Sequence, residues 1–120
     1  MVTGVGVDLV DIERFQRALE RTPKLRERLF GETDLSREGV GVPSLAARFA
    51  AKEAALKALG GHIDGFSWHD IQVQGEPGMP PELSLHGGAL ARAQEQGATS
   101  WHLSLSHDAG MAMAFVVMEG

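Results

Sequence analysis

The chain has 120 residues, 43% of them hydrophobic, which is enough for one domain with one compact core. No stretch approaches the roughly 20 consecutive apolar residues that span a bilayer, and the N-terminus lacks the features of a secretion signal, so we expect a soluble, cytoplasmic protein. The net charge of -5 argues against binding to nucleic acid or an anionic membrane, and the absence of cysteine excludes thiolate chemistry and leaves oxygen or imidazole as metal ligands.

Near the N-terminus, apolar residues alternate with small or acidic ones over residues 4–9. This period of two is typical of a strand with one apolar face and one nearly bare face, on which Asp8 is the polar side chain. Asp11 is favoured as the N-cap of a helix whose apolar stripe begins at Ile12. A second short helix is predicted to begin around Pro23.

The strongest helical pattern covers residues 44–59, with Ser44 as the predicted N-cap and Gly60 and Gly61 at the end. Its large apolar residues form one narrow stripe, which predicts the face toward the core. The stripe consists of Leu45, Phe49, Leu56 and Leu59. Lys52 falls inside it, so either its stem covers the core while the ammonium reaches water, or the ammonium is held for an anionic partner.

The second half of the chain predicts short strands and one further helix. The predicted elements are strands over 71–73 and 83–85, a helix over 88–96, and strands over 101–105 and 111–118. The last two strands meet at a turn over 108–110 and form an antiparallel hairpin. We therefore expect a compact α+β fold in which residues 1–120 form a single domain of antiparallel strands, with one long helix packed on the sheet.

Three residues could form a site together. Glu53 and Lys57 lie one turn apart on the long helix, and a Glu four residues before a Lys is also a common stabilising pair. Asp8 at a strand end is equally typical of a residue that caps a turn. Small residues beside both carboxylates would leave room for a ligand, and two carboxylates suit a Mg2+ ion bound mainly to substrate phosphates, because this ion keeps several of its waters.

Basic residues concentrate over 14–28, which holds six of the eleven Lys and Arg. Five of them step by three and four and would form one positive ridge along a helical path: Arg14, Arg17, Arg21, Lys24 and Arg28. A solvated helix face is the usual role of such a run. The alternative is a surface that docks an acidic partner and steers its approach.

Ser106 and His107 lie at the tip of the predicted hairpin, beside Asp108. Adjacent residues on a strand point to opposite faces, so these three do not suit a hydrolase triad. Phosphate binding or ordinary turn chemistry fits them better.

Three motifs stand in order along the chain: GVD over 6–8, RFAAKEAALKALG over 48–60, and LSLSH over 103–107. With them the chain resembles, nearly end to end, the holo-[acyl-carrier-protein] synthase group of the 4'-phosphopantetheinyl transferases. The resemblance implies transfer of 4'-phosphopantetheine from coenzyme A to a serine of apo acyl carrier protein, with release of adenosine 3',5'-bisphosphate, in support of fatty acid biosynthesis. It departs from the usual pattern at Gly61, His62 and Asp108.

The resemblance also implies roles for single residues. Asp8 and Glu53 would coordinate Mg2+, Glu53 or a water on the metal would deprotonate the serine, and Lys57 would neutralise or protonate the leaving group. The residues implied to hold coenzyme A are Arg48, Lys57, Gly60, Ser106 and His107. The residues implied to dock the carrier protein are Arg14, Arg17, Arg21 and Lys24. Family members form homotrimers with sites between subunits, which implies that His107 serves a neighbour's metal site.

Two other functions stay open at this point. The chain could be a non-catalytic coenzyme A binding module that docks an acidic partner, or a Mg2+-dependent phosphohydrolase that releases adenosine 3',5'-bisphosphate from coenzyme A. The combination of Asp8, Glu53 and Lys57 favours the transferase over a binding module, because a binder has no need of a metal-activating carboxylate pair.

Overall fold

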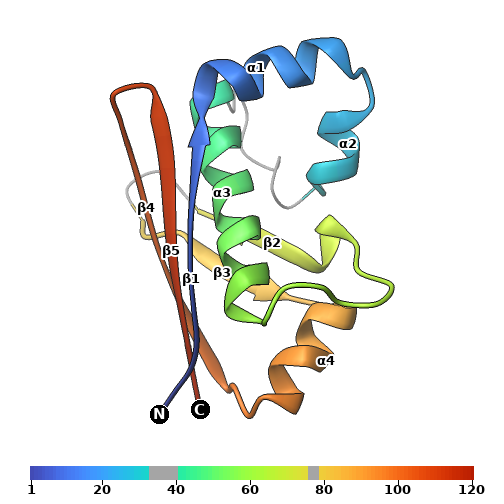
Figure 1. The fold of residues 1–120 in the computed structure, drawn as a ribbon, viewed down its shortest axis with the longest axis vertical. Helices are drawn as coiled ribbons and strands as arrows, with labels where there is room; N and C mark the ends of the chain where they lie inside the picture. The colour runs from blue at the N-terminus through green and yellow to red at the C-terminus, as the bar shows by residue number, and fades with distance from the viewer. Residues whose placement is uncertain (33–40, 76–78) are drawn as a thin grey trace.

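The computed structural model describes residues 1–32, 41–75 and 79–120, and it shows one long helix packed against antiparallel strands (Figure 1). The elements are β1 (Val2–Asp11), α1 (Ile12–Arg21), α2 (Leu25–Leu29), α3 (Val42–Ala58), a 3-10 turn η1 (Trp68–Asp70), β2 (Ile71–Gln74), β3 (Glu82–Leu85), α4 (Gly87–Glu95), β4 (Ser100–Asp108) and β5 (Met111–Glu119). The α+β fold class predicted from the sequence is confirmed. Within the described ranges, none of the helices is both long and apolar enough to cross a bilayer.

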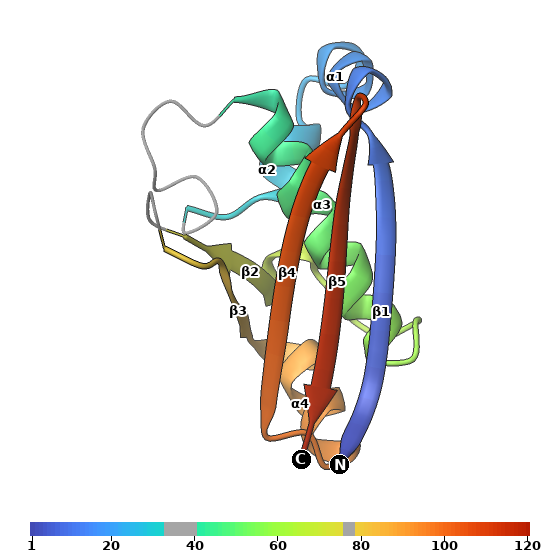
Figure 2. The same cartoon turned by 90° about the vertical axis from the view of Figure 1, so that its left-hand side faces the viewer.

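The strands of the described residues form two antiparallel sheets. The larger has the order β1-β5-β4 and the smaller pairs β2 with β3. The predicted hairpin of β4 and β5 is confirmed, and its turn places Ala109 and Gly110 at φ values of +52° and +76°. Figure 2 shows the three long strands side by side with α3 behind them, so that β1, first in the chain, lies along the last strand.

Helix α3 packs on β1 and β5 along one side and on β2 along another. Leu45 and Leu59 are fully buried as predicted, but Phe49 is only half-buried, whereas Ala50 and Ala54 are fully buried. The prediction of one narrow core stripe was therefore wrong. A helix covered on several sides needs apolar surface around most of its circumference, and alanine supplies it where the strands come close.

Strand β1 turns Gly4 and Gly6 toward α3, whereas Val5 and Val7 point away from it. A Cβ on Gly6 would lie 1.8 Å from the backbone oxygen of Ala54, and a Cβ on Gly4 would lie 2.0 Å from that of Ala58. The nearly bare face of the strand is thus filled by the helix backbone, and it offers no room for a ligand at these two positions. The apolar face of β1 points outward, and Val7 on it is 49% exposed.

The helix ends follow the sequence in part. Asp11 caps α1 as predicted, accepting a hydrogen bond from the backbone N–H of Arg14 at 3.0 Å. Helix α3 begins at Val42 after Gly41, so the predicted cap at Ser44 was wrong, because Ser44 lies in the first turn and accepts from the Arg48 guanidinium. Its C-terminal end follows the prediction, since Leu59 is the C-cap.

Lys52 is fully buried, so the expectation that its ammonium reaches water was wrong. Its Nζ donates to the backbone oxygens of Trp68, at 2.9 Å, and of Ile71, and it lies 5.8 Å from the centre of the Phe30 ring. These carbonyl groups replace the water that the ammonium loses on burial. Lys52 therefore ties α3 to η1 and the start of β2.

Candidate active site

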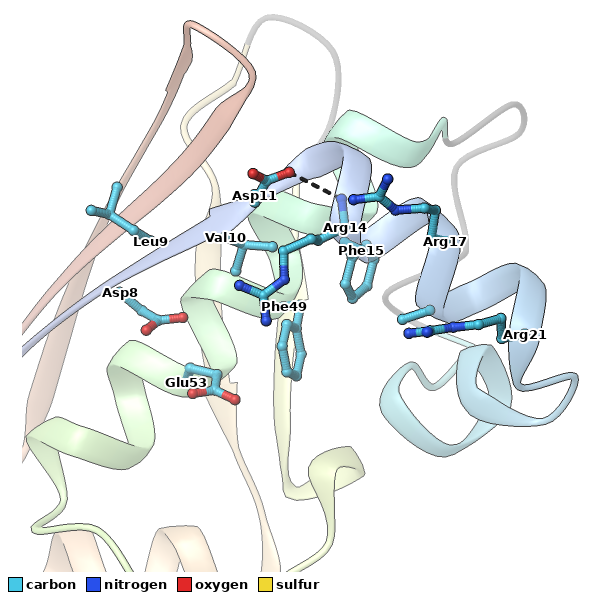
Figure 3. Close-up of a pocket in the computed structure, with 11 residues that line it drawn as sticks. Asp8, Leu9, Val10, Asp11, Arg14, Phe15, Arg17, Arg21, Phe49 and Glu53 are labelled. Carbon is cyan, nitrogen blue, oxygen red and sulfur yellow. Dashed lines mark hydrogen bonds between the residues drawn. The ribbon is translucent and has the colours of Figure 1, made fainter.

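The structure brings Asp8, Glu53 and Lys57 together where β1 runs alongside α3. Asp8 and Glu53 line one open hollow of about 740 Å3, and Figure 3 shows both carboxylates directed into it. Lys57 Nζ donates to Asp8 Oδ1 at 3.0 Å and to the Val7 carbonyl oxygen at 3.2 Å. The lysine thus forms its ion pair with a residue 49 positions away in the chain, not with the glutamate one turn before it on the helix.

The surroundings of Glu53 change the pKa of its carboxyl group. Burial raises the pKa of the Glu53 carboxyl, the nearby Asp8 carboxylate raises it further, and Lys57 opposes both effects. Two carboxylates that repel each other at the edge of one hollow offer oxygen donors that a hard divalent cation accepts, and its charge would relieve the repulsion. Among the described residues there is no group of three or more His, Asp or Glu side chains placed to hold a metal, so a cation here would keep water or substrate oxygens as further ligands.

Helix α1 borders the same hollow with basic side chains. Arg14, Arg17 and Arg21 line it and are exposed, and Arg17 also pairs with Glu13 at 3.4 Å. Figure 3 shows Arg14 reaching from α1 toward the carboxylate side of the hollow. Lys24, the N-cap of α2, is exposed but does not line the hollow.

Apolar side chains complete this hollow, and one of them was missed by the sequence analysis. Phe49 lines the hollow and stacks on Phe15, with ring centroids 5.4 Å apart, although the sequence pattern assigned it to the core stripe. The sequence spacing could have predicted this position, because Phe49 lies one helical turn before Glu53 and therefore on the same side of α3. The hollow therefore combines carboxylates, an apolar wall and a basic rim.

Three of the residues implied to hold coenzyme A line a second hollow. Arg48, Ser106 and His107 border it, with Ser44 at the start of α3. Arg48 is buried, whereas Ser106 and His107 are exposed at the end of β4. Arg48 and Glu53 are five residues apart, a rotation of roughly 140° around the helix, so the two hollows open on different sides of α3. Within one chain, therefore, the residues implied to hold coenzyme A do not all lie around Glu53.

Gly60 lies at a third place, beyond the C-terminal end of α3. Gly60 and Gly61 have φ values of +91° and +94°, which glycine adopts without strain. Side chains of α4 reach this end, since Arg92 Nη1 and Gln96 Nε2 donate to the Leu59 carbonyl oxygen at 2.8 and 3.0 Å. The sequence analysis missed both side chains, because they lie more than 30 positions away and carry no local signal.

Comparisons with known proteins agree on one family. The family model described as the 4'-phosphopantetheinyl transferase superfamily matches residues 4–116. The holo-[acyl-carrier-protein] synthase of Beutenbergia cavernae is 57% identical over 119 residues, covering 99% of each chain. The structure of the holo-[acyl-carrier-protein] synthase of Neisseria meningitidis matches all of both chains with a TM-score of 0.86 and 34% identity. That of Helicobacter pylori, solved in complex with coenzyme A, matches 96% of this chain and 99% of its own with a TM-score of 0.82 and 32% identity.

Proposed function

The chain belongs to the 4'-phosphopantetheinyl transferase superfamily, and we propose that it acts as a holo-[acyl-carrier-protein] synthase. It transfers the 4'-phosphopantetheine moiety of coenzyme A to a serine of apo acyl carrier protein and releases adenosine 3',5'-bisphosphate. The observation that carries this proposal is the meeting of Asp8, Glu53 and Lys57, from β1 and α3, beside the basic side chains of α1. We further propose that residues 1–120 work as one transferase domain, in the cytoplasm, in support of fatty acid biosynthesis.

Magnesium is proposed as the cofactor, and Asp8 and Glu53 are the side chains that would hold it. Their fit rests on geometry, because both carboxylates line the same hollow. Burial and the nearby Asp8 carboxylate raise the pKa of Glu53, and the charge of a cation would relieve both effects. When bound, Mg2+ supplies Lewis-acid neutralisation of the coenzyme A pyrophosphate.

Glu53, which lines the hollow, and Lys57, which pairs with Asp8, can carry the proton steps of the transfer. Glu53 accepts the proton of the carrier serine. The serine oxygen bonds to the β-phosphorus, the bond from that phosphorus to the bridging oxygen breaks, and adenosine 3',5'-bisphosphate leaves. Lys57, held by Asp8 and Val7, neutralises or protonates the leaving phosphate.

The basic side chains of α1 are proposed to receive the carrier protein. Arg14, Arg17, Arg21 and Lys24 are all exposed, and the three arginines line the hollow that contains Glu53. An acidic helix of the carrier would be attracted by these charges and oriented along α1. Its serine would then be delivered to the side of the hollow where Glu53 lies.

We propose that three copies of the chain assemble with their sites between subunits. The outer face of β1 and β5 carries large apolar side chains, among them Leu9 at 60% and Phe115 at 43% exposure, which a second copy could cover. The separation of Arg48, Ser106 and His107 from Glu53 supports the same arrangement. In it, coenzyme A contacts Lys57 and Gly60 of one subunit and the second hollow of its neighbour, whose His107 serves the adjoining metal site.

Intact-protein mass spectrometry of an apo acyl carrier protein tests the proposed function. The carrier is incubated with this chain, coenzyme A and Mg2+, with a parallel sample that contains a chelator. We expect a mass gain of one phosphopantetheine, and its loss with the chelator. No gain with several carriers would contradict the transferase and favour the coenzyme A binding module.

A further inference from the structure

Residues 60–62 form the loop that follows α3. This loop contains two glycines, and the space beside Gly61 is open. Gly60 and Gly61 both have positive φ, and a Cβ on Gly61 would meet no atom within 4 Å. Two neighbouring glycines lose more conformational entropy on ordering than any other pair of residues. A ligand can therefore approach this backbone closely, provided that something else holds the loop in shape.

One side chain of α4 bonds to the carbonyl groups on both sides of the two glycines. Arg92 Nη1 donates to the Leu59 carbonyl oxygen at 2.8 Å, and Arg92 Nη2 donates to the His62 carbonyl oxygen at 3.0 Å. The guanidinium is planar and rigid, so it fixes the separation of these two oxygens. Its own position is fixed as well, because α4 is anchored by the fully buried Ala89 and Ala93.

Capping of α3 does not account for the second of these bonds. The helix end is closed by backbone hydrogen bonds from Gly60 to Lys57 at 3.0 Å and from Gly61 to Leu56 at 2.9 Å. The carbonyl group of His62 lies beyond the helix, so the bond that it accepts from Arg92 shapes the loop and not the helix end. The His62 side chain, in contrast, is largely exposed and contacts the exposed Asp64.

We infer that Arg92 is a positioning residue for coenzyme A, which holds loop 60–62 in its binding shape before the ligand arrives. The inference rests on the proposed function, in which Gly60 contacts coenzyme A. Preorganisation lowers the entropy that binding has to remove, so it acts on the affinity for coenzyme A. Chemistry at Glu53 and docking of the carrier on α1 do not depend on it.

The test compares Arg92→Met and Arg92→Lys with wild type in the transfer assay, varying coenzyme A and carrier separately. Arg26→Met, which removes an exposed arginine of α2, is the matched control. We expect Arg92→Met to raise the KM for coenzyme A about five- to tenfold, with kcat and the KM for carrier within about twofold of wild type. Arg92→Lys should behave like Arg92→Met, because a point charge does not bridge two carbonyl groups as a fork does.

Three results would overturn the inference: an unchanged KM for coenzyme A in Arg92→Met, full rescue by lysine, or a loss of kcat with unchanged KM. If Arg92→Met fails to fold, Arg92→Lys carries the same expectation. Absence of transfer by the wild type would instead contradict the proposed function. In that case calorimetric titration with coenzyme A decides the inference, which fails if wild type and Arg92→Met bind equally or not at all.

Discussion

Gly6 of β1 lies so close to Ala54 of α3 that a Cβ on the glycine would be 1.8 Å from the alanine's backbone oxygen. Asp8 follows two residues later and so lies on the same side of the strand as Gly6. Glu53 directly precedes Ala54 on the helix. The contact between glycine and alanine backbone therefore sets how close the two carboxylates of the hollow come to each other.

Replacing Gly6 by alanine should separate β1 from α3. We expect Gly6→Ala to lower the free energy of unfolding by about 2 to 3 kcal/mol, because the added methyl group meets backbone and not a flexible side chain. Denaturant unfolding measures this loss. Gly31→Ala is the control, since its Cβ would come no closer than 3.8 Å to side-chain atoms, and equal losses in the two variants would contradict the role given to Gly6.

The raised pKa of Glu53 predicts a pH-dependent gain in stability for Glu53→Gln. The folded-state pKa lies above the ordinary value of 4.5, so the wild type loses stability as the pH rises through the folded pKa and the charged carboxylate forms. In chelator, Glu53→Gln should therefore have a higher Tm than wild type at pH 8, and the difference should disappear at pH 4. Thermal unfolding at both pH values measures it, and a difference of the same size at pH 4 would show that ionisation is not the cause.

Removal of Asp8 should abolish transfer and the response to metal. We expect Asp8→Ala to reduce kcat by about 100-fold or more, because the variant loses one proposed carboxylate ligand and the ion-pair partner of Lys57. Mg2+ should raise the Tm of wild type but not that of Asp8→Ala. Carrier binding, measured by titration without coenzyme A, should persist. Wild-type transfer rates in Asp8→Ala would rule out the metal assignment.

Mixing two inactive variants tests the proposed sharing of sites between subunits. Asp8→Ala and His107→Ala each lack one part of the site, but a mixed trimer contains junctions at which both side chains are intact. With random assembly of equal amounts after joint refolding, about a quarter of the junctions should be complete, so about a quarter of wild-type activity should return. Activity no higher than that of the separate variants would place Asp8 and His107 in the same subunit's site.

Reversing one charge of α1 should weaken binding of the carrier protein without affecting binding of coenzyme A. We expect Arg14→Glu to raise the KM for carrier about tenfold or more at low salt, because like charges then face each other across the interface. The KM for coenzyme A should stay at the wild-type value. Arg26→Glu, on an exposed residue of α2 outside the hollow, should have a smaller effect. An unchanged KM for carrier in Arg14→Glu would rule out docking on α1.

The sequence by itself determined the elements that depend on neighbouring residues. The alternation over β4 and β5, the Asp11 cap and the glycines after α3 are local signals, and each predicted an element that the structure contains. The motifs that carry Asp8 and Glu53 also pointed to the family, because their spacing along the chain is visible without a structure.

Only the tertiary structure decided how distant parts of the chain meet. It turned the glycine face of β1 toward α3, paired Lys57 with Asp8 and buried Lys52 against backbone carbonyl groups. It also placed Arg92 beside loop 60–62 and His107 away from Glu53. These relationships depend on which strand lies on which side of a helix. The packing of residues far apart in the chain decides that arrangement. The local periodicity and spacing of the sequence therefore do not predict it.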